Sequence, residues 1–288
     1  MKVGVIGTGL MGRPMAVKLQ QAGYEVIAYN RSAEKLQPLA DVGIAIASSP
    51  LEVLSSSECT VLMLTDRAAI AETILSQAAI SGLSGRTIIQ MGTIAPEDSK
   101  EIAREVVEAG GNYLEAPVLG SIPQVKDGTL LLMVGASKDE FQRWLPLLQT
   151  FGPEPLYLGP VGSGAMVKLA MNQLIGSLTT AFALSLHVIQ QEGIDIEAFM
   201  QLLRQSALYA PTFDKKLQRM LDSNYSNPNF PVKHLLKDSN LFLRVAEQMQ
   251  LDASLISGVT QVLQTACDRG YMDEDYSALF EGVFIREF

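Results

Sequence analysis

Three glycines near the start of the chain have the spacing of a phosphate-binding turn. Gly7, Gly9 and Gly12 follow a short apolar strand at 3–6 and precede a helix expected over 13–22. Gly7 permits a tight turn, Gly9 lets the backbone approach a pyrophosphate, and Gly12 lets the helix pack closely on the strand. The helix N-terminus then offers free N–H groups to the anion. This turn predicts a dinucleotide site, with an ordinary strand-to-helix turn as the alternative. The residues expected to line it are Gly7, Thr8, Gly9, Leu10, Met11 and Gly12.

The end of the expected second strand, residues 25–30, indicates which dinucleotide is bound. NAD-binding units place a carboxylate there, which binds the ribose 2′-hydroxyl. This chain has Asn30, Arg31 and Ser32 instead, so no carboxylate is present to bind a hydroxyl or repel a phosphate. The planar guanidinium of Arg31 suits a 2′-phosphate. We therefore expect NADPH to be preferred over NADH, with a solvated loop arginine as the alternative.

Lys168 and Asn172 are the best candidates for proton chemistry. They lie four residues apart in GSGAMVKLAMN, so one helix would bring both to the same face. Burial and a helix N-terminus both disfavour an ammonium ion, and we expect them to lower the pKa of Lys168 toward the range useful for proton transfer. Asn172 would orient the lysine or the substrate. A lysine that extends its charge to solvent beside a surface asparagine is the alternative.

A second polar cluster lies in NFPVKHLLKDSNL, where Lys233 and Lys237 are four residues apart and Asp238 follows. Basic groups in an acidic protein suit a substrate that carries a carboxylate, although a solvated helix face is their usual meaning. The two histidines, His187 and His234, have no metal-ligand spacing around them. We expect both to be structural and predict no metal site.

The surrounding pattern predicts how these residues are positioned. Short apolar runs alternate with helical stretches up to about residue 158, which is typical of a parallel, doubly wound Rossmann sheet. From Gly164 onward the pattern is helical, beginning with one helix of about 28 residues. We expect a dinucleotide-binding Rossmann domain at 1–162 and an all-α substrate and dimerisation domain at 163–288. In such folds ligands bind beyond the carboxyl ends of the strands, in the cleft between the domains.

Composition limits the class of partner. The chain has 288 residues, 48% of them hydrophobic, and a formal net charge of −9, which argues against nucleic acid or an anionic membrane as the main partner. The two cysteines have no metal spacing and are expected to be reduced thiols. With no signal peptide recognised, we expect a cytoplasmic protein.

The segment 169–186 is nearly long enough to span a bilayer, but it contains Asn172 and Gln173. We expect it to be buried at the centre of a domain or a dimer rather than in a membrane. A helix from Gly164 to Glu192 has more apolar surface than one small helical domain can cover. A homo-oligomer, most simply a C2 homodimer formed through the second domains, is the resulting expectation.

Four segments together resemble one family. They are the glycine turn at 7–12, EAPVLGS at 115–121, GSGAMVKLAMN at 162–172, and Lys237-Asp238. The chain resembles the β-hydroxyacid dehydrogenases, which include 3-hydroxyisobutyrate dehydrogenases, tartronate semialdehyde reductases and glyoxylate/succinic semialdehyde reductases. The resemblance covers nearly the whole chain. YNRS, MGT and FPVKHLLKD are most similar to the glyoxylate/succinic semialdehyde reductase branch, which uses NADPH.

The resemblance implies a role for each matching residue. Lys168 corresponds to the catalytic lysine that protonates the alkoxide formed by hydride transfer, and Asn172 to the asparagine beside it. Thr93 corresponds to a residue near substrate and nicotinamide, and Phe230 and Asp238 to residues that close the site. Further cofactor contacts are implied for Met63, Leu64, Thr65, Thr93 and Lys237.

One position departs from the family pattern. The substrate loop usually reads Pro-Val-Ser-Gly, and here Leu119 replaces the serine that helps to hold the substrate carboxylate. Leucine donates no hydrogen bond, so the carboxylate must depend on the backbone at Gly120 and Ser121, on the Ser121 hydroxyl, or on Lys168. We therefore expect an NADPH-dependent reductase of small aldehyde acids. The alternatives are a 3-hydroxyisobutyrate-type dehydrogenase using NAD, a tartronate semialdehyde reductase, or an inactive cofactor-binding scaffold.

Overall fold

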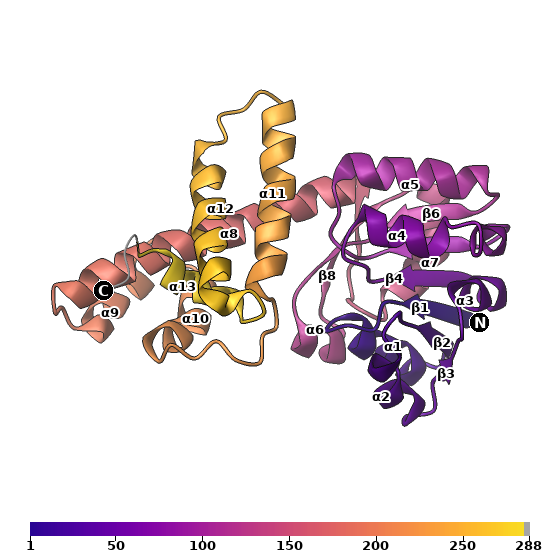
Figure 1. Ribbon diagram of the computed structural model, residues 1–288, viewed down its shortest axis with the longest axis horizontal. Helices are drawn as coiled ribbons and strands as arrows, with labels where there is room; N and C mark the ends of the chain where they lie inside the picture. Colours follow the sequence, from indigo (N-terminus) through magenta and orange to yellow (C-terminus); the bar gives the residue numbers. More distant parts are fainter. Residues whose placement is uncertain (285–288) are drawn as a thin grey trace. The chain divides into compact units, whose positions relative to one another are not determined.

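The computed structural model describes residues 1–284, which form two compact units that divide between Lys168 and Leu169. The N-terminal unit is built on a nine-stranded sheet in the order β3-β2-β1-β4-β5-β6-β8-β7, with β9 beside β8. Figure 1 shows this order from β3 at the bottom, through β2, β1 and β4, to β6 near the top. The strands are β1 (Lys2–Ile6), β2 (Glu25–Tyr29), β3 (Ala45–Ile46), β4 (Cys59–Leu62), β5 (Thr87–Gln90), β6 (Asn112–Glu115), β7 (Val118–Leu119), β8 (Leu131–Gly135) and β9 (Leu156–Gly159).

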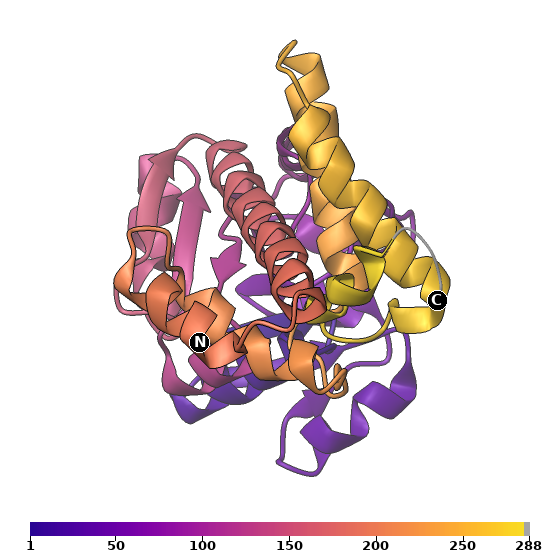
Figure 2. The same ribbon diagram turned by 90° about the vertical axis from the view of Figure 1, so that its left-hand side faces the viewer.

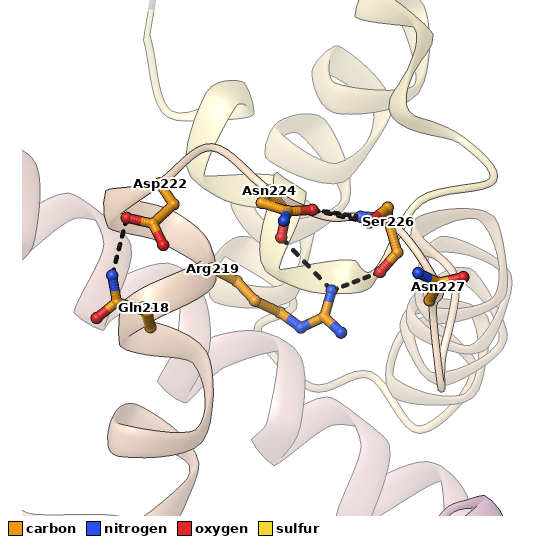
Figure 3. A pocket seen from close by; sticks show the side chains of 6 residues that line it. All are labelled: Gln218, Arg219, Asp222, Asn224, Ser226 and Asn227. Atoms are coloured by element: carbon orange, nitrogen blue, oxygen red, sulfur yellow. Dashed lines mark hydrogen bonds between the residues drawn. The ribbon is translucent and has the colours of Figure 1, made fainter.

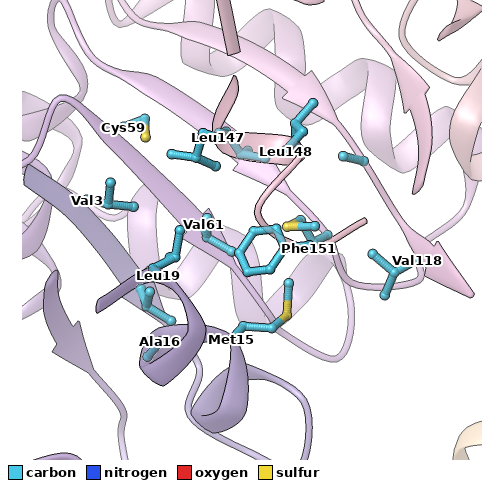
Figure 4. Close-up of a cluster of buried hydrophobic side chains, with 14 of the residues drawn as sticks. Val3, Met15, Ala16, Leu19, Cys59, Val61, Val118, Leu147, Leu148 and Phe151 are labelled. Carbon is cyan, nitrogen blue, oxygen red and sulfur yellow. The ribbon is translucent and has the colours of Figure 1, made fainter. Parts of the chain in front are cut away.

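Helices connect the strands and cover both faces of the sheet. They are α1 (Gly12–Gln21), α2 (Gln37–Ala40), α3 (Pro50–Ser56), α4 (Arg67–Ile74), α5 (Pro96–Glu108), α6 (Ile122–Asp127) and α7 (Lys138–Leu148), with short 3-10 turns at Ala33–Lys35 and Ile80–Leu83. Alternate strand residues enter two separate cores. One core joins Val3 and Val61 to α1 and α7 around Phe151, as Figure 4 shows. The other joins Ile6 and Leu62 to α3, α4 and α5. A sheet buried on both faces in this way is the predicted doubly wound Rossmann arrangement.

The sheet is parallel, as expected, except at one edge. β1 to β6 are parallel, but β8 runs antiparallel to β6 and to β7. The connection from β7 to β8 contains only the six-residue helix α6, whereas a parallel return needs a long crossover. Pro117 lies between β6 and β7 and separates them into two strands.

The C-terminal unit is helical, as predicted. It contains most of α8 (Ser163–Gln191), followed by α9 (Ile196–Gln205), α10 (Pro211–Leu221), α11 (Val232–Gln248), α12 (Ser254–Ala266) and α13 (Leu279–Gly282), with short turns at Cys267–Tyr271 and Tyr276–Ala278. Figures 1 and 2 both show α11 and α12 side by side. The core of this unit packs Phe182 and Leu186 of α8 against α10, α11, α12 and α13.

Helix α8 connects the two units without a break. It begins at Ser163, where the sequence predicted the domain boundary, while the compact units divide within it. It is long and apolar enough to cross a membrane, and 39% of its most apolar window is buried. One such helix is weak evidence for a membrane span, because the core helices of soluble proteins have the same length and composition.

Candidate active site

The glycine turn between β1 and α1 has the geometry that its spacing predicts. Gly7 has a φ of 92°, a conformation that favours glycine, and its N–H donates to the Tyr29 carbonyl at 3.0 Å. A Cβ on Gly12 would lie 1.8 Å from the Gly7 carbonyl oxygen, so only glycine fits there. A Cβ on Gly9 would meet no protein atom within 4 Å. The backbone at Gly9 is thus open to a ligand.

Asn30 holds this turn in place. Its Oδ1 accepts a hydrogen bond from the Thr8 N–H at 3.0 Å, and its Nδ2 donates to the Ser32 carbonyl at 3.1 Å. One carboxamide therefore fixes the glycine turn and the loop after β2 at the same time. Sequence reasoning assigned Asn30 to the cofactor, and the structure gives it bonds to the two loops expected to bind that cofactor.

The turn fits a dinucleotide pyrophosphate. The Thr8 hydroxyl is buried and has no hydrogen-bond partner among the described residues. Met11 is the N-cap residue of α1, and its side chain makes no capping hydrogen bond. It therefore leaves the first N–H groups of the helix available to a ligand. Leu10 is exposed beside them. An orphaned hydroxyl, an open glycine and an uncapped helix N-terminus are the features that a phosphate group would satisfy.

Arg31 is available to an anionic ligand. Its side chain is 85% exposed, and its nearest acidic partner is Glu72, at 3.7 Å between Nη1 and Oε2. An ion pair that long, between two exposed side chains, contributes little. Ser32 follows in extended backbone conformation and starts the short turn at 33–35.

Two further loops approach the glycine turn at the ends of β4 and β5. A Cβ on Gly7 would lie 2.4 Å from the Met63 carbonyl oxygen, and one on Gly92 would lie 2.4 Å from that of Leu64. Both glycines therefore allow the Met63–Leu64 backbone to lie between the two turns. The buried Gln90 side chain bonds to the N–H and the carbonyl of Gly92, which fixes the turn before Thr93. The structure thus brings the predicted cofactor residues at 7–12, 63–65 and 93 to one edge of the sheet.

The substrate loop follows β7. Leu119 is half-buried and pairs with Leu131 of β8. Gly120 has a φ of 134°, and a Cβ there would lie 2.6 Å from the Leu130 side chain. The N–H and the hydroxyl of Ser121 both donate to Gln124 Oε1, at 2.9 and 2.8 Å. The turn is therefore rigid, and Ser121 takes part in the start of α6.

Lys168 lies in the second turn of α8 and is only 8% exposed. Asn172 is one helical turn later and is buried. Its Nδ2 donates to Asp238 Oδ2 at 2.6 Å, and Asp238 Oδ1 lies 3.0 Å from Lys237 Nζ. The structure therefore joins Asn172 to the Lys237-Asp238 pair, which the sequence placed in a separate segment. The two partners in the Asn172–Asp238 bond are buried, and Lys237 is partly exposed. Burial of Lys168 favours the proton-donor hypothesis over a lysine that extends into solvent.

Phe230 precedes α11 and contacts Tyr276 through both its backbone and its ring. Its carbonyl accepts from the Tyr276 N–H at 2.9 Å, and the two rings meet edge to face with centroids 5.8 Å apart. The next residue, Pro231, forms an isolated bridge with Asp275. Sequence reasoning missed Tyr276, because no spacing in the chain connects it with Phe230.

The described residues contain no group of three or more His, Cys, Asp or Glu side chains able to hold a metal ion. His187 is buried, with Nε2 2.8 Å from the Phe280 carbonyl oxygen. Burial lowers the pKa of both His187 and His234 below the ordinary value. Figure 3 shows the side chains that line a pocket around Arg219, whose guanidinium donates to the Ser226 carbonyl at 2.8 Å. It contains none of the predicted site residues.

Comparisons with known proteins agree with this architecture. The chain matches the NAD binding domain of 6-phosphogluconate dehydrogenase over residues 2–159, and the NAD-binding domain of NADP-dependent 3-hydroxyisobutyrate dehydrogenase over residues 162–282. The fold is similar to a crystal structure of 3-hydroxyisobutyrate dehydrogenase from Salmonella typhimurium, with a TM-score of 0.86, 24% identity, and coverage of 98% of this chain and 99% of that one.

Two plant enzymes are similar in sequence. Glyoxylate/succinic semialdehyde reductase 2, chloroplastic, from Arabidopsis thaliana is 34% identical, over 98% of this chain and 79% of its own length. Glyoxylate/succinic semialdehyde reductase 1 from the same plant is 31% identical, over 100% of both chains. Because these matches extend over both units and agree with the nucleotide-binding turn, the chain belongs to the β-hydroxyacid dehydrogenase family, near its glyoxylate/succinic semialdehyde reductase branch, and is an NAD(P)-dependent oxidoreductase.

Proposed function

We propose that this protein is an NADPH-dependent reductase of small aldehyde acids such as glyoxylate and succinic semialdehyde, with Lys168 as the proton donor. The observation that carries the proposal is the burial of Lys168 one helical turn before Asn172, whose carboxamide is fixed by Asp238. The names of the two plant relatives support the substrate class. The exposed Arg31, with no carboxylate beside it at 30 or 32, supports NADPH.

In this mechanism the protein binds the cofactor and moves one proton. The turn at 7–12 would hold the pyrophosphate, with the loops at 63–65 and 93 beside it. A bound reduced nicotinamide would supply the hydride that the aldehyde carbon accepts. Lys168 gives a proton to the aldehyde oxygen as negative charge develops there, so that a carbonyl becomes a hydroxyl. Asn172, fixed by its hydrogen bond to Asp238, orients the lysine and the substrate relative to each other.

A substrate panel tests the proposal. Steady-state rates are measured with NADPH and with NADH, against glyoxylate, succinic semialdehyde and tartronate semialdehyde, and with NADP and NAD against 3-hydroxyisobutyrate. We expect the highest kcat/KM for an aldehyde acid with NADPH. Faster oxidation of 3-hydroxyisobutyrate with NAD would favour the dehydrogenase alternative. Turnover of no substrate in the panel would favour a binding scaffold.

Leu119 predicts a high KM for glyoxylate, which one substitution should lower. Glyoxylate has little besides its carboxylate to bind, and leucine gives that group no donor. Leu119→Ser should lower the KM for glyoxylate by about 5- to 13-fold, the value of one hydrogen bond of about 1–1.5 kcal/mol. Leu119→Ala controls for the lost side-chain volume. If both variants change the KM equally, the hydroxyl has no role in carboxylate binding.

We also propose a homodimer formed through α8. Leu174, Leu178, Leu184 and Val188 are each at least 41% exposed, and their spacing keeps them on one side of the helix. Light scattering at micromolar concentration should give about twice the chain mass of 31.2 kDa. Leu178→Asp should shift that mass toward the monomer, whereas Leu251→Asp, at an exposed leucine outside α8, should not. A wild-type mass near 31.2 kDa would refute the dimer.

The location in the cytoplasm remains a proposal as well. Cys59 and Cys267 are both free thiols, which is usual in a reducing compartment.

A further inference from the structure

A buried carboxylate lies at the start of the helix that carries Lys168. Glu115 is the last residue of β6 and is only 1% exposed. Its Oε1 accepts hydrogen bonds from the backbone N–H groups of Gly162, at 2.8 Å, and Ala165, at 3.1 Å. These are among the N–H groups that have no partner within α8 itself. Glu115 therefore caps this helix from a strand 47 residues earlier in the chain.

The surroundings of Glu115 leave it little freedom. Its other oxygen, Oε2, accepts from the Ser99 hydroxyl, which lies 2.8 Å from the Tyr113 hydroxyl. Burial raises the pKa of the Glu115 carboxyl above its ordinary value, while the hydrogen bonds from Ser99 and the backbone oppose that rise. A negative charge is also favourable at a helix N-terminus.

Two glycines provide the space for this contact. Gly135 is paired with Glu115 across β6 and β8, and a Cβ there would lie 2.3 Å from Glu115 Oε1. Gly164 is in the first turn of α8, and a Cβ there would lie 2.3 Å from the Met133 carbonyl oxygen. The first turn of α8 therefore packs closely on β8 and is hydrogen-bonded to Glu115 of β6. These contacts fix its position on the sheet.

We propose that Glu115 is a positioning residue for the reaction: by fixing the first turn of α8 on the sheet, it sets where the Lys168 ammonium lies. Lys168 follows Ala165 by less than one helical turn, so a shift of the capped N–H groups moves the lysine with them. Misplacement of a catalytic group by about 1 Å costs up to about 100-fold in rate. The inference rests on the proposed role of Lys168 as proton donor.

Glu115→Gln tests this role, with Tyr113→Phe as a matched control. The first removes the charge at the helix terminus with almost no change in shape. The second removes a hydroxyl from the same buried cluster without touching α8. We expect Glu115→Gln to lower kcat for aldehyde reduction by at least about 10-fold, and Tyr113→Phe to leave it within about twofold. The dissociation constant for NADPH, measured by fluorescence, should stay within about twofold of the wild-type value in both variants. The glycine turn follows β1, whereas both substitutions are in β6.

Two measurements separate positioning from a general loss of stability. Amide hydrogen exchange at Gly162 and Ala165 should accelerate in Glu115→Gln and remain unchanged in Tyr113→Phe. In a Lys168→Ala background, Glu115→Gln should produce no further loss of kcat, because it acts through the lysine. If Glu115→Gln fails to fold, Gly135→Ala supplies the same test, since its Cβ displaces the carboxylate oxygen.

The outcomes distinguish this inference from the proposed function. A wild-type kcat in Glu115→Gln, together with a large loss in Lys168→Ala, overturns the positioning role alone. An additive loss in the double variant also overturns it, because Glu115 would then act independently of the lysine. A wild-type kcat in Lys168→Ala overturns the proton-donor role and the positioning role together.

Discussion

Lys168→Ala should lower kcat for aldehyde reduction by about 10²- to 10⁴-fold, the range for loss of a general acid. The cause is the loss of the proton that neutralises the developing alkoxide. NADPH affinity should be unchanged, because the residues proposed to bind the cofactor lie in the turns at 7–12, 63–65 and 93. Single-turnover kinetics with saturating NADPH would measure the effect on the chemical step directly.

Lys168→Arg discriminates between two uses of the positive charge. A guanidinium does not release its proton at working pH, so this variant should be as slow as the alanine variant if the lysine is the acid. If Lys168 only anchors the substrate carboxylate, arginine should restore part of the activity and the main defect should be a raised KM. Lys233→Ala, at a half-exposed lysine paired with Asp273, controls for the loss of one charge. A kcat within about threefold of wild type in Lys168→Ala, with fold and NADPH affinity intact, would exclude the mechanism.

Arg31→Asp should raise the KM for NADPH by about 10- to 150-fold and leave the KM for NADH unchanged or lower. A charge-assisted contact to a phosphate is worth about 1.5–3 kcal/mol, and an aspartate adds repulsion to that loss. Initial rates with each cofactor at saturating aldehyde provide both constants. Because the Arg31 side chain is exposed, its substitution should not disturb folding, and the raised KM would reflect cofactor binding.

Lys35→Asp is the matched control for Arg31→Asp. Lys35 is also exposed and lies in the same loop, so the substitution changes the net charge by the same amount nearby. We expect it to change the KM for NADPH by less than about threefold, since a screened charge without direct contact contributes little. Equal losses with NADPH and NADH in Arg31→Asp would contradict contact with the 2′-phosphate.

The parts of the fold that depend on local backbone geometry were predictable from the sequence. The turn at 7–12 is an example, since Gly7 and Gly12 are required by a positive φ and by a close approach within a few residues. The long helix from residue 164 was also predictable, because its apolar positions continue without a proline or an internal break. The antiparallel edge at β7 and β8 was not, because apolar residues alone do not indicate strand direction.

Contacts between distant segments limited the prediction of the site. Asn172 and Asp238 were each identified, but the bond between them spans 66 residues and leaves no trace in spacing. The sequence presents Glu115 only as the first residue of EAPVLGS, because its partners at 162 and 165 become apparent only when β6 and α8 lie together in the fold. Gln90 was missed for a different reason. A buried glutamine that bonds to the backbone two residues later looks, in sequence, like any polar strand residue.

The two bonds of Asn30 affect how the coenzyme preference of this enzyme can be redesigned. A carboxylate at the end of β2 is the usual way to select NADH, and Asn30 is the position where protein engineers would place it. An aspartate there still accepts from the Thr8 N–H, but it has no N–H to donate to the Ser32 carbonyl, and two oxygens would then face each other. The loop that carries Arg31 would lose its anchor in the same step. A change to NADH therefore requires at least two coordinated substitutions, and a single exchange at residue 30 leads through a less stable intermediate sequence.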